Sequence, residues 1–357
     1  TLVFFGEPAE KVCGSKPVHA AHGYYDGIDA AISFHPAYFA AYSNTCVWDT
    51  HCGCYWSKIY TFECREPEKW ASMGAGASAS PHTIARAPGA IDAVCLMYTT
   101  SKYTKEAMLP HTGTWTLNEA ILVAGQATSD NLAPGISQIQ YSGRAPTVAM
   151  VERMFAVLDN NADHVAGMTH CTVRKDWVTK TRPGLPNHAM AELTYANLAL
   201  AGAPQWGAEA KKFARELQKN VGVRPMDDPM DPAMASLMPP ERGEAIVRGS
   251  LPPWQKNYTS DDYTDWTWHM PTSRLYVGRP QLRAPRAGHA YPDWCWLALG
   301  GHPPAIDPTI LTAARAISAT IVDLASEPAA LARARDEFVE RTGGGIGGRR
   351  WLAPLLP

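Results

Sequence analysis

Two short apolar runs open the chain and indicate buried strands. Residues 1–6 (TLVFFG) are apolar up to a glycine, and residues 30–36 (AAISFHP) form a second apolar run that a proline ends. Runs of this length between turn residues are typical of parallel strands in an α/β sheet. Ligands in such sheets bind at the carboxyl ends of strands, so Glu7, Glu10 and His35 are candidates for chemistry by position alone.

The first run starts at Thr1 without a turn, a helix cap or an initiator methionine. A domain rarely begins in the middle of a strand. We therefore expect a preceding piece that was removed or that persists as a separate chain. Such an amino-terminal fragment should stay bound, because losing a central strand exposes apolar sheet edges.

The hydrophobic pattern changes near residue 45. Residues 57–64 alternate like a half-exposed antiparallel strand, and residues 88–103 have helical apolar spacing. Two more strand patterns follow, at residues 121–124 and 137–141, then a helix from about residue 147 to 166 and a strand that starts at Cys171. Strand, helix, strand, strand, helix, strand is the split βαβ order, which predicts a small α+β domain inserted at residues 45–178.

The remaining residues return to an α/β pattern, with helices predicted near residues 187–200, 207–218 and 310–325. The predicted fold class is therefore α/β. A three-layer α/β/α domain with a mostly parallel sheet occupies residues 1–44 and 179–357, and the inserted domain is ferredoxin-like. The proline-rich stretch at 225–240 carries four methionines and predicts a surface loop with packed methionines, or alternatively a flexible lid over substrate.

Composition narrows the class of protein. The 357 residues are 46% hydrophobic and 18% charged, so the chain can bury a large core and disorder is excluded. Basic and acidic residues number 32 and 34, which leaves no electrostatic footprint for nucleic acid or an anionic membrane. No apolar run approaches the roughly 20 residues that span a bilayer. Eight scattered cysteines in so long a chain favour a reducing cytoplasm.

Carboxylates and histidines form three candidate clusters: Glu10 in its loop, His35 at a strand end, and His289 with His302 nearby. These residue types suit a zinc-like or manganese-like cation that activates water, with a free carboxylate as general base. Taken singly, each histidine is as readily a core or surface residue.

An acidic segment at 259–268 reads most simply as a surface turn. Alternatively, Asp262 or Asp265 orients a ligating histidine from outside the ligand set. The run His51-Cys52-Gly53-Cys54 lacks a second pair of ligands at zinc-finger spacing, so it indicates structural thiols.

Several separated motifs together resemble the metal-dependent aminoacylase and carboxypeptidase family, in particular its aminobenzoyl-glutamate hydrolase type. Residues 6–10 (GEPAE), 24–31 (YYDGIDAA) and 34–36 (FHP) resemble the catalytic segment of that family. The motifs at 79–83, 90–94 and 129–134 resemble its lid, 260–268 its late acidic motif, and 288–289 its last histidine ligand. The motifs run in order along nearly the whole chain, which makes the set far more specific than any one of them.

The resemblance implies roles for individual residues. Glu10 matches the general base, and His35 and His289 match ligands of a divalent metal, zinc or manganese. Asn131 matches a substrate-contacting residue of the lid, and Arg144 is a candidate partner for a substrate carboxylate. The lid of this family also mediates dimerisation, so the resemblance implies a homo-oligomer.

Three departures from the family pattern bear on the site. Lys11 stands where the family has a second glutamate that binds metal, and an ammonium cannot be a ligand, so a two-metal site is in doubt. Glu119 stands where related lids often have a histidine and is a candidate substrate-binding residue. The first ligands of the family lie upstream of the catalytic strand, which implies that an amino-terminal fragment or companion chain supplies them.

The resulting functional prediction is a cytoplasmic metal-dependent amidohydrolase. It cleaves the amide C–N bond of a small N-acyl or N-aroyl amino acid with metal-activated water and a glutamate base. One alternative is an aminohydrolase that releases ammonia from an activated aryl amine. A second alternative is a non-catalytic, metal-free partner subunit, which the lysine in a ligand position favours.

Overall fold

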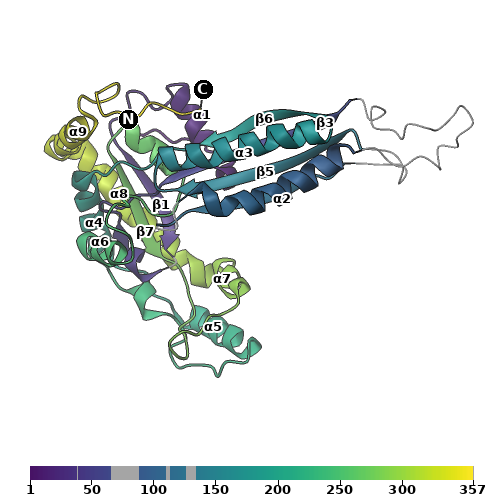
Figure 1. The fold of residues 1–357 in the computed structure, drawn as a ribbon. Coiled ribbons are helices and arrows are strands. Elements are labelled where there is room, and N and C mark those ends of the chain that lie inside the picture. The colour runs from purple at the N-terminus through teal and green to yellow at the C-terminus, as the bar shows by residue number, and fades with distance from the viewer. Residues whose placement is uncertain (38, 66–87, 110–112, 126–133, 357) are drawn as a thin grey trace, which may run out of the picture.

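The computed structural model describes residues 1–37, 39–65, 88–109, 113–125 and 134–356. Two parts are visible in Figure 1. A body of helices around a small sheet lies on the left, and an elongated sheet with two helices, here called the inserted unit, projects to the right. Both termini lie on the body, and the carboxyl terminus lies near α1 (Ser15–Ala21). The chain is thus a mixed α/β structure with two separate sheets.

The sheet of the body has three described strands in the order β1-β7-β2. The bounds are Ala31–Ala37 for β1, Thr272–Gly278 for β7 and Thr45–Cys46 for β2. The predicted strand at residues 30–36 is confirmed as β1, which runs parallel to β7. The short β2 is antiparallel to β7, so the expected parallel arrangement holds for one of these two pairings.

The predicted buried strand at residues 1–6 is wrong. Residues 1–9 have no regular secondary structure, and Leu2 and Phe4 are 74% and 94% exposed. Among the described strands, β1 lies at a sheet edge and pairs only with β7. An apolar run forms a buried strand only where a neighbour satisfies its backbone hydrogen bonds, and no described strand offers that ladder here.

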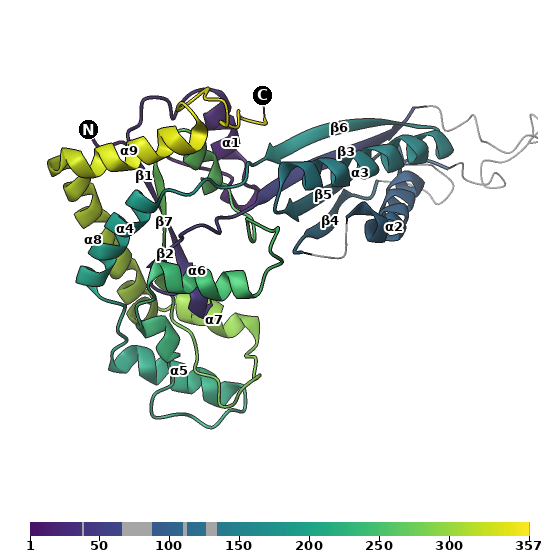
Figure 2. The ribbon, with the colours of Figure 1, turned by 60° about the vertical axis from the view of Figure 1, so that its left-hand side comes forward.

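Helices α4, α8 and α9 build one side of the body (Figure 2). Two of the predicted helices are confirmed, as α4 and α8. Both pack on β7 through a cluster that includes Leu198, Ala316, Leu275 and Val277. The bounds are His188–Ala201 for α4, Pro303–Ser326 for α8 and Pro328–Thr342 for α9.

One described helix, α8, is long and apolar enough to cross a membrane by length and composition. Short polar residues interrupt its apolar run. Core helices of soluble proteins meet the same criteria. Here α8 contacts α4, α9, β1 and β7.

The other end of the body is built around α5, α7 and a methionine-lined loop. The third predicted helix is confirmed as α5. Met230 and Met234 are buried against α5 and α7, which favours packed methionines over a flexible lid in this stretch. The remaining bounds are Ala208–Asn220 for α5, Pro232–Ala235 for η5, Pro240–Gly249 for α6 and Asp293–Gly300 for α7.

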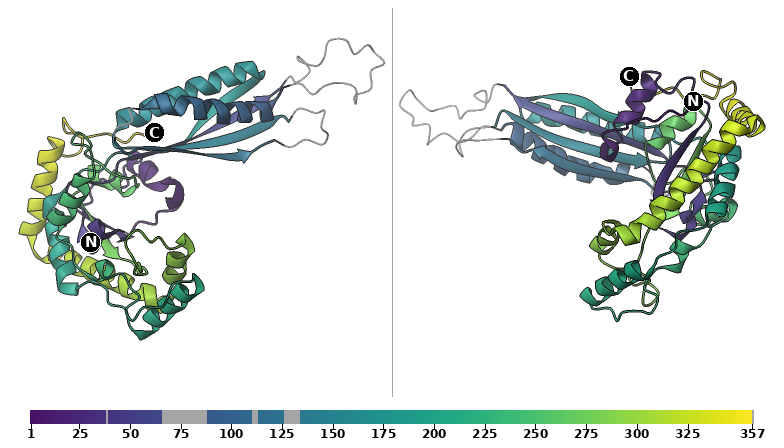
Figure 3. Two further views of the ribbon diagram at one scale, coloured as in Figure 1. Left: turned by 60° about the horizontal axis from the view of Figure 1, so that its bottom comes forward. Right: turned by 180° about the vertical axis from the view of Figure 1, so that it is seen from behind.

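The inserted unit has the predicted element order, β3-α2-β4-β5-α3-β6, and its strands pair antiparallel in the order β4-β5-β3-β6. Both helices cover the same face of this sheet (Figure 3). The bounds are Cys54–Cys64, Ala90–Met108, Thr116–Val123, Ile136–Ala145, Val148–Met168 and Cys171–Lys180, in chain order. Because β2 belongs to the body, the unit begins at β3 and ends with β6, whereas the sequence placed its ends at residues 45 and 178.

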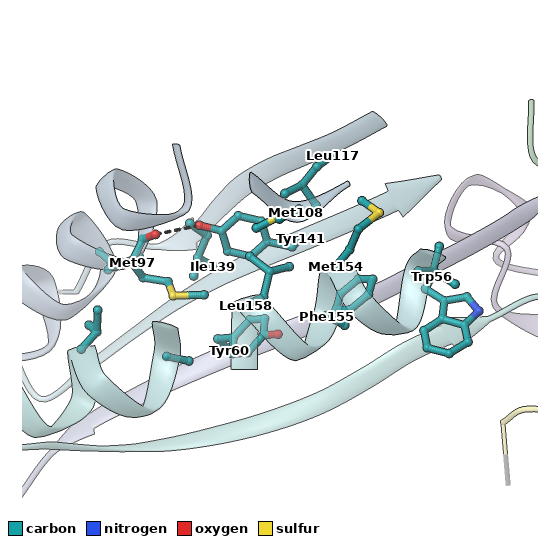
Figure 4. Packing of buried hydrophobic residues seen from close by; sticks show 14 of the residues in the cluster. Trp56, Tyr60, Met97, Met108, Leu117, Ile139, Tyr141, Met154, Phe155 and Leu158 are labelled. Carbon is teal, nitrogen blue, oxygen red and sulfur yellow. Dashed lines mark hydrogen bonds between the residues drawn. The ribbon is translucent and has the colours of Figure 1, made fainter. Parts of the chain in front are cut away.

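The core of the inserted unit lies between the helices and the sheet (Figure 4). Tyr60 and Tyr141 from neighbouring strands meet Met97 and Leu158 from the two helices, and all four are fully buried. The hydroxyl of Tyr141 donates to the Met97 carbonyl at 3.1 Å, which satisfies its one polar atom. Strand β3 is central and almost wholly buried, so the expectation of a half-exposed strand there is wrong.

Candidate active site

Glu10 lies on a tight turn between the body and the inserted unit. It starts the single turn η1 (Glu10–Val12), which is flanked by Ala9 and Cys13 with φ of 58° and 51°. Left-handed backbone at residues other than glycine costs about 1 kcal/mol or more each and persists only where surrounding contacts hold it. One such contact is the Thr179 hydroxyl of β6, which donates to the Cys13 carbonyl at 2.6 Å. The turn leaves the Glu10 side chain exposed.

His35 lies near the carboxyl end of β1 with its ring half-buried. Its Nδ1 is 2.8 Å from the Pro36 carbonyl oxygen. Burial lowers the pKa of His35, the Arg274 guanidinium lowers it further, and the negative charges of Asp261 and Glu10 oppose the shift. The imidazole is therefore neutral near pH 7, the form that accepts a proton or binds a metal.

Arg274 is a buried residue that contacts several side chains of this region. Its side chain is buried on β7, and its guanidinium donates to the Ser33 hydroxyl at 2.5 Å and pairs with Asp261. The guanidinium also lies 4.2 Å from the centre of the Tyr263 ring. Burial raises the pKa of Asp261, but the charge of Arg274 and the hydrogen bonds of Asp262 together lower it by more, so Asp261 remains a carboxylate at neutral pH.

Asp262 has a different environment from its neighbour. Its Oδ2 is 3.0 Å from the ammonium of Lys16, and both side chains are buried. Burial raises the pKa of Asp262 to about 7, with Lys16 lowering it in part and Asp261 raising it. The pKa values of the two adjacent aspartates are thus shifted in opposite directions, because Arg274 and hydrogen bonds outweigh burial at Asp261, whereas burial outweighs Lys16 at Asp262.

The charged groups that act on the Cys13 thiol show which side chains lie near the turn. Burial raises the pKa of its thiol, the charges of Asp262, Asp261 and Glu10 add to the rise, and Arg144 opposes it. Arg144 lies on β5 of the inserted unit, with its guanidinium 4.7 Å from the centre of the Tyr55 ring. The structure therefore brings four predicted residues into one region: Glu10, His35, Arg144 and Asp262.

Asp265 has no part in this region's exposed surface. Its carboxylate and backbone oxygen accept hydrogen bonds from Arg182 at 2.7 and 2.9 Å, and both side chains are fully buried. A third Arg182 nitrogen donates to the Leu352 carbonyl at 2.8 Å. In the described structure the carboxylates of Asp262 and Asp265 contact basic residues, Lys16 and Arg182, rather than a histidine. The structure thus gives no support to their predicted role of orienting a histidine.

Two other predicted residues, Glu119 and His289, lie elsewhere. Glu119 on β4 forms an ion pair with Lys102 of α2, within the inserted unit. Asn131 lies outside the described residues. His289 precedes α7, and Figures 1 and 2 agree that α7 and α5 lie at the opposite end of the body from α1.

Whether this region can bind a metal ion depends on how many possible ligands lie close together. Across the described ranges, no group of three or more His, Cys, Asp and Glu side chains lies close enough to hold a metal ion. His35 has Glu10 and Asp261 in its electrostatic neighbourhood, but Asp261 is engaged by Arg274. The described side chains alone therefore do not fit a metal centre.

The residues around Cys52 are buried. His51 is fully buried with its Nδ1 2.9 Å from the Tyr263 hydroxyl, and burial lowers its pKa to about 3. Cys52 Sγ lies 3.2 Å from the Thr259 hydroxyl. All eight cysteines are free thiols.

Sequence reasoning missed Lys16, Arg274 and Asp261 as site residues. Lys16 and Arg274 gave no signal, because a basic residue in a helix or a strand is usually solvated and only the fold shows that these two are buried. Asp261 was within the acidic motif, but one-dimensional spacing does not tell which of three aspartates faces β1.

The sequence of the chain is 24% identical over 353 residues to a subunit of p-aminobenzoyl-glutamate hydrolase from Escherichia coli (strain K12). The match covers 96% of this chain and 68% of that protein. The predicted family resemblance is confirmed. No family model matches the chain.

Several solved structures match this chain, each with a TM-score below 0.5. An aminobenzoyl-glutamate utilization protein from Klebsiella pneumoniae has a TM-score of 0.43 at 13% identity, over 87% of this chain and 60% of that one. A dinuclear metal-binding peptidase of the M20 family from Bacillus subtilis has a TM-score of 0.38 at 11% identity, over 88% and 63%. An amidase of the hydantoinase/carbamoylase family from Burkholderia multivorans has 0.35 at 13% identity, over 82% and 55%. The chain thus spans less than two thirds of each of these solved proteins.

Proposed function

We propose that the chain is the larger part of an amidohydrolase that cleaves the C–N bond of a small N-acyl or N-aroyl amino acid. One observation supports this most directly. Glu10, in a motif that resembles the aminobenzoyl-glutamate hydrolase type, is exposed on a strained turn whose surroundings include His35 and Arg144. An exposed carboxylate beside a neutral imidazole and a guanidinium is the donor set that amide hydrolysis needs.

In this proposal each side chain has a separate task. Glu10 accepts a proton from the attacking water and delivers it to the leaving nitrogen. Arg144 reaches the substrate from the inserted unit and pairs with its carboxylate through two parallel N–H donors. Burial and the charge of Arg274, which contacts Ser33 and Asp261, lower the pKa of His35 and keep it neutral.

The proposal includes a divalent cation, zinc or manganese, only if further ligands complete its site. In an enzyme of this type it supplies a water of lowered pKa. His35 is the one described residue here that would hold it. The remaining ligands would come from an amino-terminal fragment or companion chain, since the relative is itself one subunit of its enzyme and Lys11 cannot coordinate. A homo-oligomer formed through the inserted unit remains part of the same proposal.

The test is hydrolysis of p-aminobenzoyl-glutamate by the purified protein together with any chain that copurifies. We expect release of p-aminobenzoate and glutamate, and a 10²- to 10⁴-fold loss of rate in Glu10→Gln. Glu209→Gln, at an exposed position of α5, is the matched control and should keep the full rate. Release of ammonia without a carboxylic acid product would instead identify an aminohydrolase.

A second candidate is a metal-free partner subunit. Lys11 and the lack of a metal-binding group among the described side chains favour it. Metal analysis of the purified assembly separates the two. Bound zinc or manganese with a Glu10→Gln defect supports the hydrolase, whereas a metal-free assembly whose function survives Glu10→Gln supports the partner role.

A further inference from the structure

Two cysteines lie opposite each other on neighbouring strands of the inserted unit. Cys64 is the last residue of β3 and Cys171 is the first residue of β6. The register of this antiparallel pair places them directly opposite each other. They lie at the end of the unit that points away from the body (Figure 1). Strand pairing therefore sets the spacing of the two residues.

The backbone hydrogen bonds show which kind of pair this is. The N–H of Cys64 donates to the Gly135 carbonyl at 2.9 Å, on the side of β3 that faces β5. The preceding residue, Glu63, faces β6, where its carbonyl accepts from the Thr172 hydroxyl at 3.4 Å. Cys64 and Cys171 are therefore a non-hydrogen-bonded pair, whose Cα atoms are about 4.5 Å apart. A disulfide needs a Cα separation of roughly 4.4–6.8 Å, so the backbone already has a suitable spacing.

Both side chains also point to the same face of the sheet. Alternate residues of a strand share a face, so Cys64 lies on the face of Tyr60 and Phe62, which belong to the core under the helices. Figure 4 shows Tyr60 in this core. Cys171 packs against the same core together with Val173. The two thiols can therefore approach each other without a change in the strands.

The environment of the two thiols sets how they react. Burial raises the pKa of the Cys171 thiol to about 11, the Thr169 carbonyl lowers it in part, and the Cys64 thiol adds to the rise. The reactive thiolate is thus scarce at neutral pH, and oxidation is slow. Cys64 is only 8% exposed and Cys171 is half-buried, so a small oxidant reaches Cys171 first. The one contact that Cys171 gives up is weak, a donation from its Sγ to the Thr169 carbonyl at 3.6 Å.

We propose that Cys64 and Cys171 form a reversible disulfide when the protein meets a small-molecule disulfide such as oxidised glutathione. The Cys171 thiolate attacks one sulfur of the oxidant, releases one glutathione thiolate and forms a mixed disulfide. The Cys64 thiolate then attacks Cys171 Sγ, and the second glutathione leaves as a thiolate. The protein gives two electrons to the oxidant, and the protons of both cysteines pass to the released thiolates.

The disulfide acts as a cross-link at the edge of the sheet. Strand β6 is an edge strand that pairs with β3, and the disulfide ties its first residue to that central strand. The closed loop contains α2, β4, β5 and α3, and a cross-link over a long loop stabilises the fold by restricting the unfolded chain. The turn that carries Glu10 contacts Thr179, near the other end of β6. The inference is therefore independent of the proposed function.

The test uses the whole purified protein, reduced, freed of reductant and incubated with oxidised glutathione at about pH 8.5 to raise the thiolate fraction. Remaining thiols are then alkylated, and the peptides are mapped by mass spectrometry. We expect a linked pair of peptides that contain Cys64 and Cys171, and dithiothreitol should separate them. In urea, the equilibrium constant for unfolding should be about 30- to 1,000-fold smaller for the oxidised protein, the range typical of one disulfide.

Three variants connect the effect to this pair. Cys64→Ser and Cys171→Ser each remove one sulfur, so the linked peptides and the gain in stability on oxidation should both be lost. Cys95→Ser changes an exposed cysteine of α2 and is the matched control. It should form the cross-link and gain stability like the parent.

Recovery of Cys64 and Cys171 as separate alkylated thiols or separate glutathione adducts would overturn the inference. In the parent protein, reaction of the exposed Cys95 with glutathione shows that the oxidant was active. A linked pair that leaves urea unfolding unchanged would equally overturn the role as a stabilising cross-link. So would a gain in stability that persists in Cys171→Ser, since it would then come from another thiol.

Discussion

The buried pair of Arg182 and Asp265 offers a quantitative test of the region that carries the acidic motif. Both side chains are fully buried, and Arg182 donates three hydrogen bonds, two to Asp265 and one to the Leu352 carbonyl. Arg182→Met keeps the apolar stem but leaves a buried carboxylate without its partner. Breaking one side of such a pair costs about 3–5 kcal/mol. We therefore expect the free energy of unfolding, measured by urea denaturation, to fall by that amount.

The double variant Arg182→Met/Asp265→Leu distinguishes the loss of the ion pair from a loss of side-chain packing. Replacing both partners with apolar residues removes the stranded charge, so it should recover most of the loss. Burial raises the pKa of Asp265 while Arg182 lowers it in part. Without Arg182 the folded-state pKa rises further above its unfolded value. Stability of Arg182→Met is then retained at low pH and lost as pH rises, so its deficit should be larger at pH 8 than at pH 5.

A loss of under about 1 kcal/mol in Arg182→Met would refute this reasoning, because exposed ion pairs give such values. If the double variant is as unstable as the single variant, the loss of stability comes from altered packing or from the lost hydrogen bond to Leu352.

Two further predictions concern the body. A Cβ at Gly278 would overlap the Met234 carbonyl oxygen, so Gly278→Ala must displace the η5 backbone, and we expect a loss of about 1–3 kcal/mol by urea denaturation. Burial raises the pKa of Asp262 to about 7, above its ordinary 3.8. The folded state then binds more protons, so stability should fall by up to about 3 kcal/mol from pH 5 to pH 8. Asp262→Asn, which has no proton to lose, should show a flatter profile, and an equally steep one would assign the pH dependence to other groups.

The sequence by itself determined the local elements. A short apolar run predicted β1, alternation with a period of 2 predicted β3, and α/β patterning with helical apolar spacing predicted the helices of the inserted unit and α4, α5 and α8. The sequence also singled out Glu10, His35 and Arg144, which the fold brings into one region. The motif order anticipated the sequence relationship to the p-aminobenzoyl-glutamate hydrolase of Escherichia coli.

Only the tertiary structure decided which of these residues meet. Whether residues 1–6 form a strand depends on a neighbouring strand, and the described sheet offers none. Which aspartate of the acidic motif lies near His35, and which binds Lys16 or Arg182, depends on side-chain direction in the 3₁₀ turn η6 (Tyr263–Trp268) and in the two residues before it. The charge on a buried group is likewise set by its neighbours and by loss of water, since both are properties of packing across distant parts of the chain.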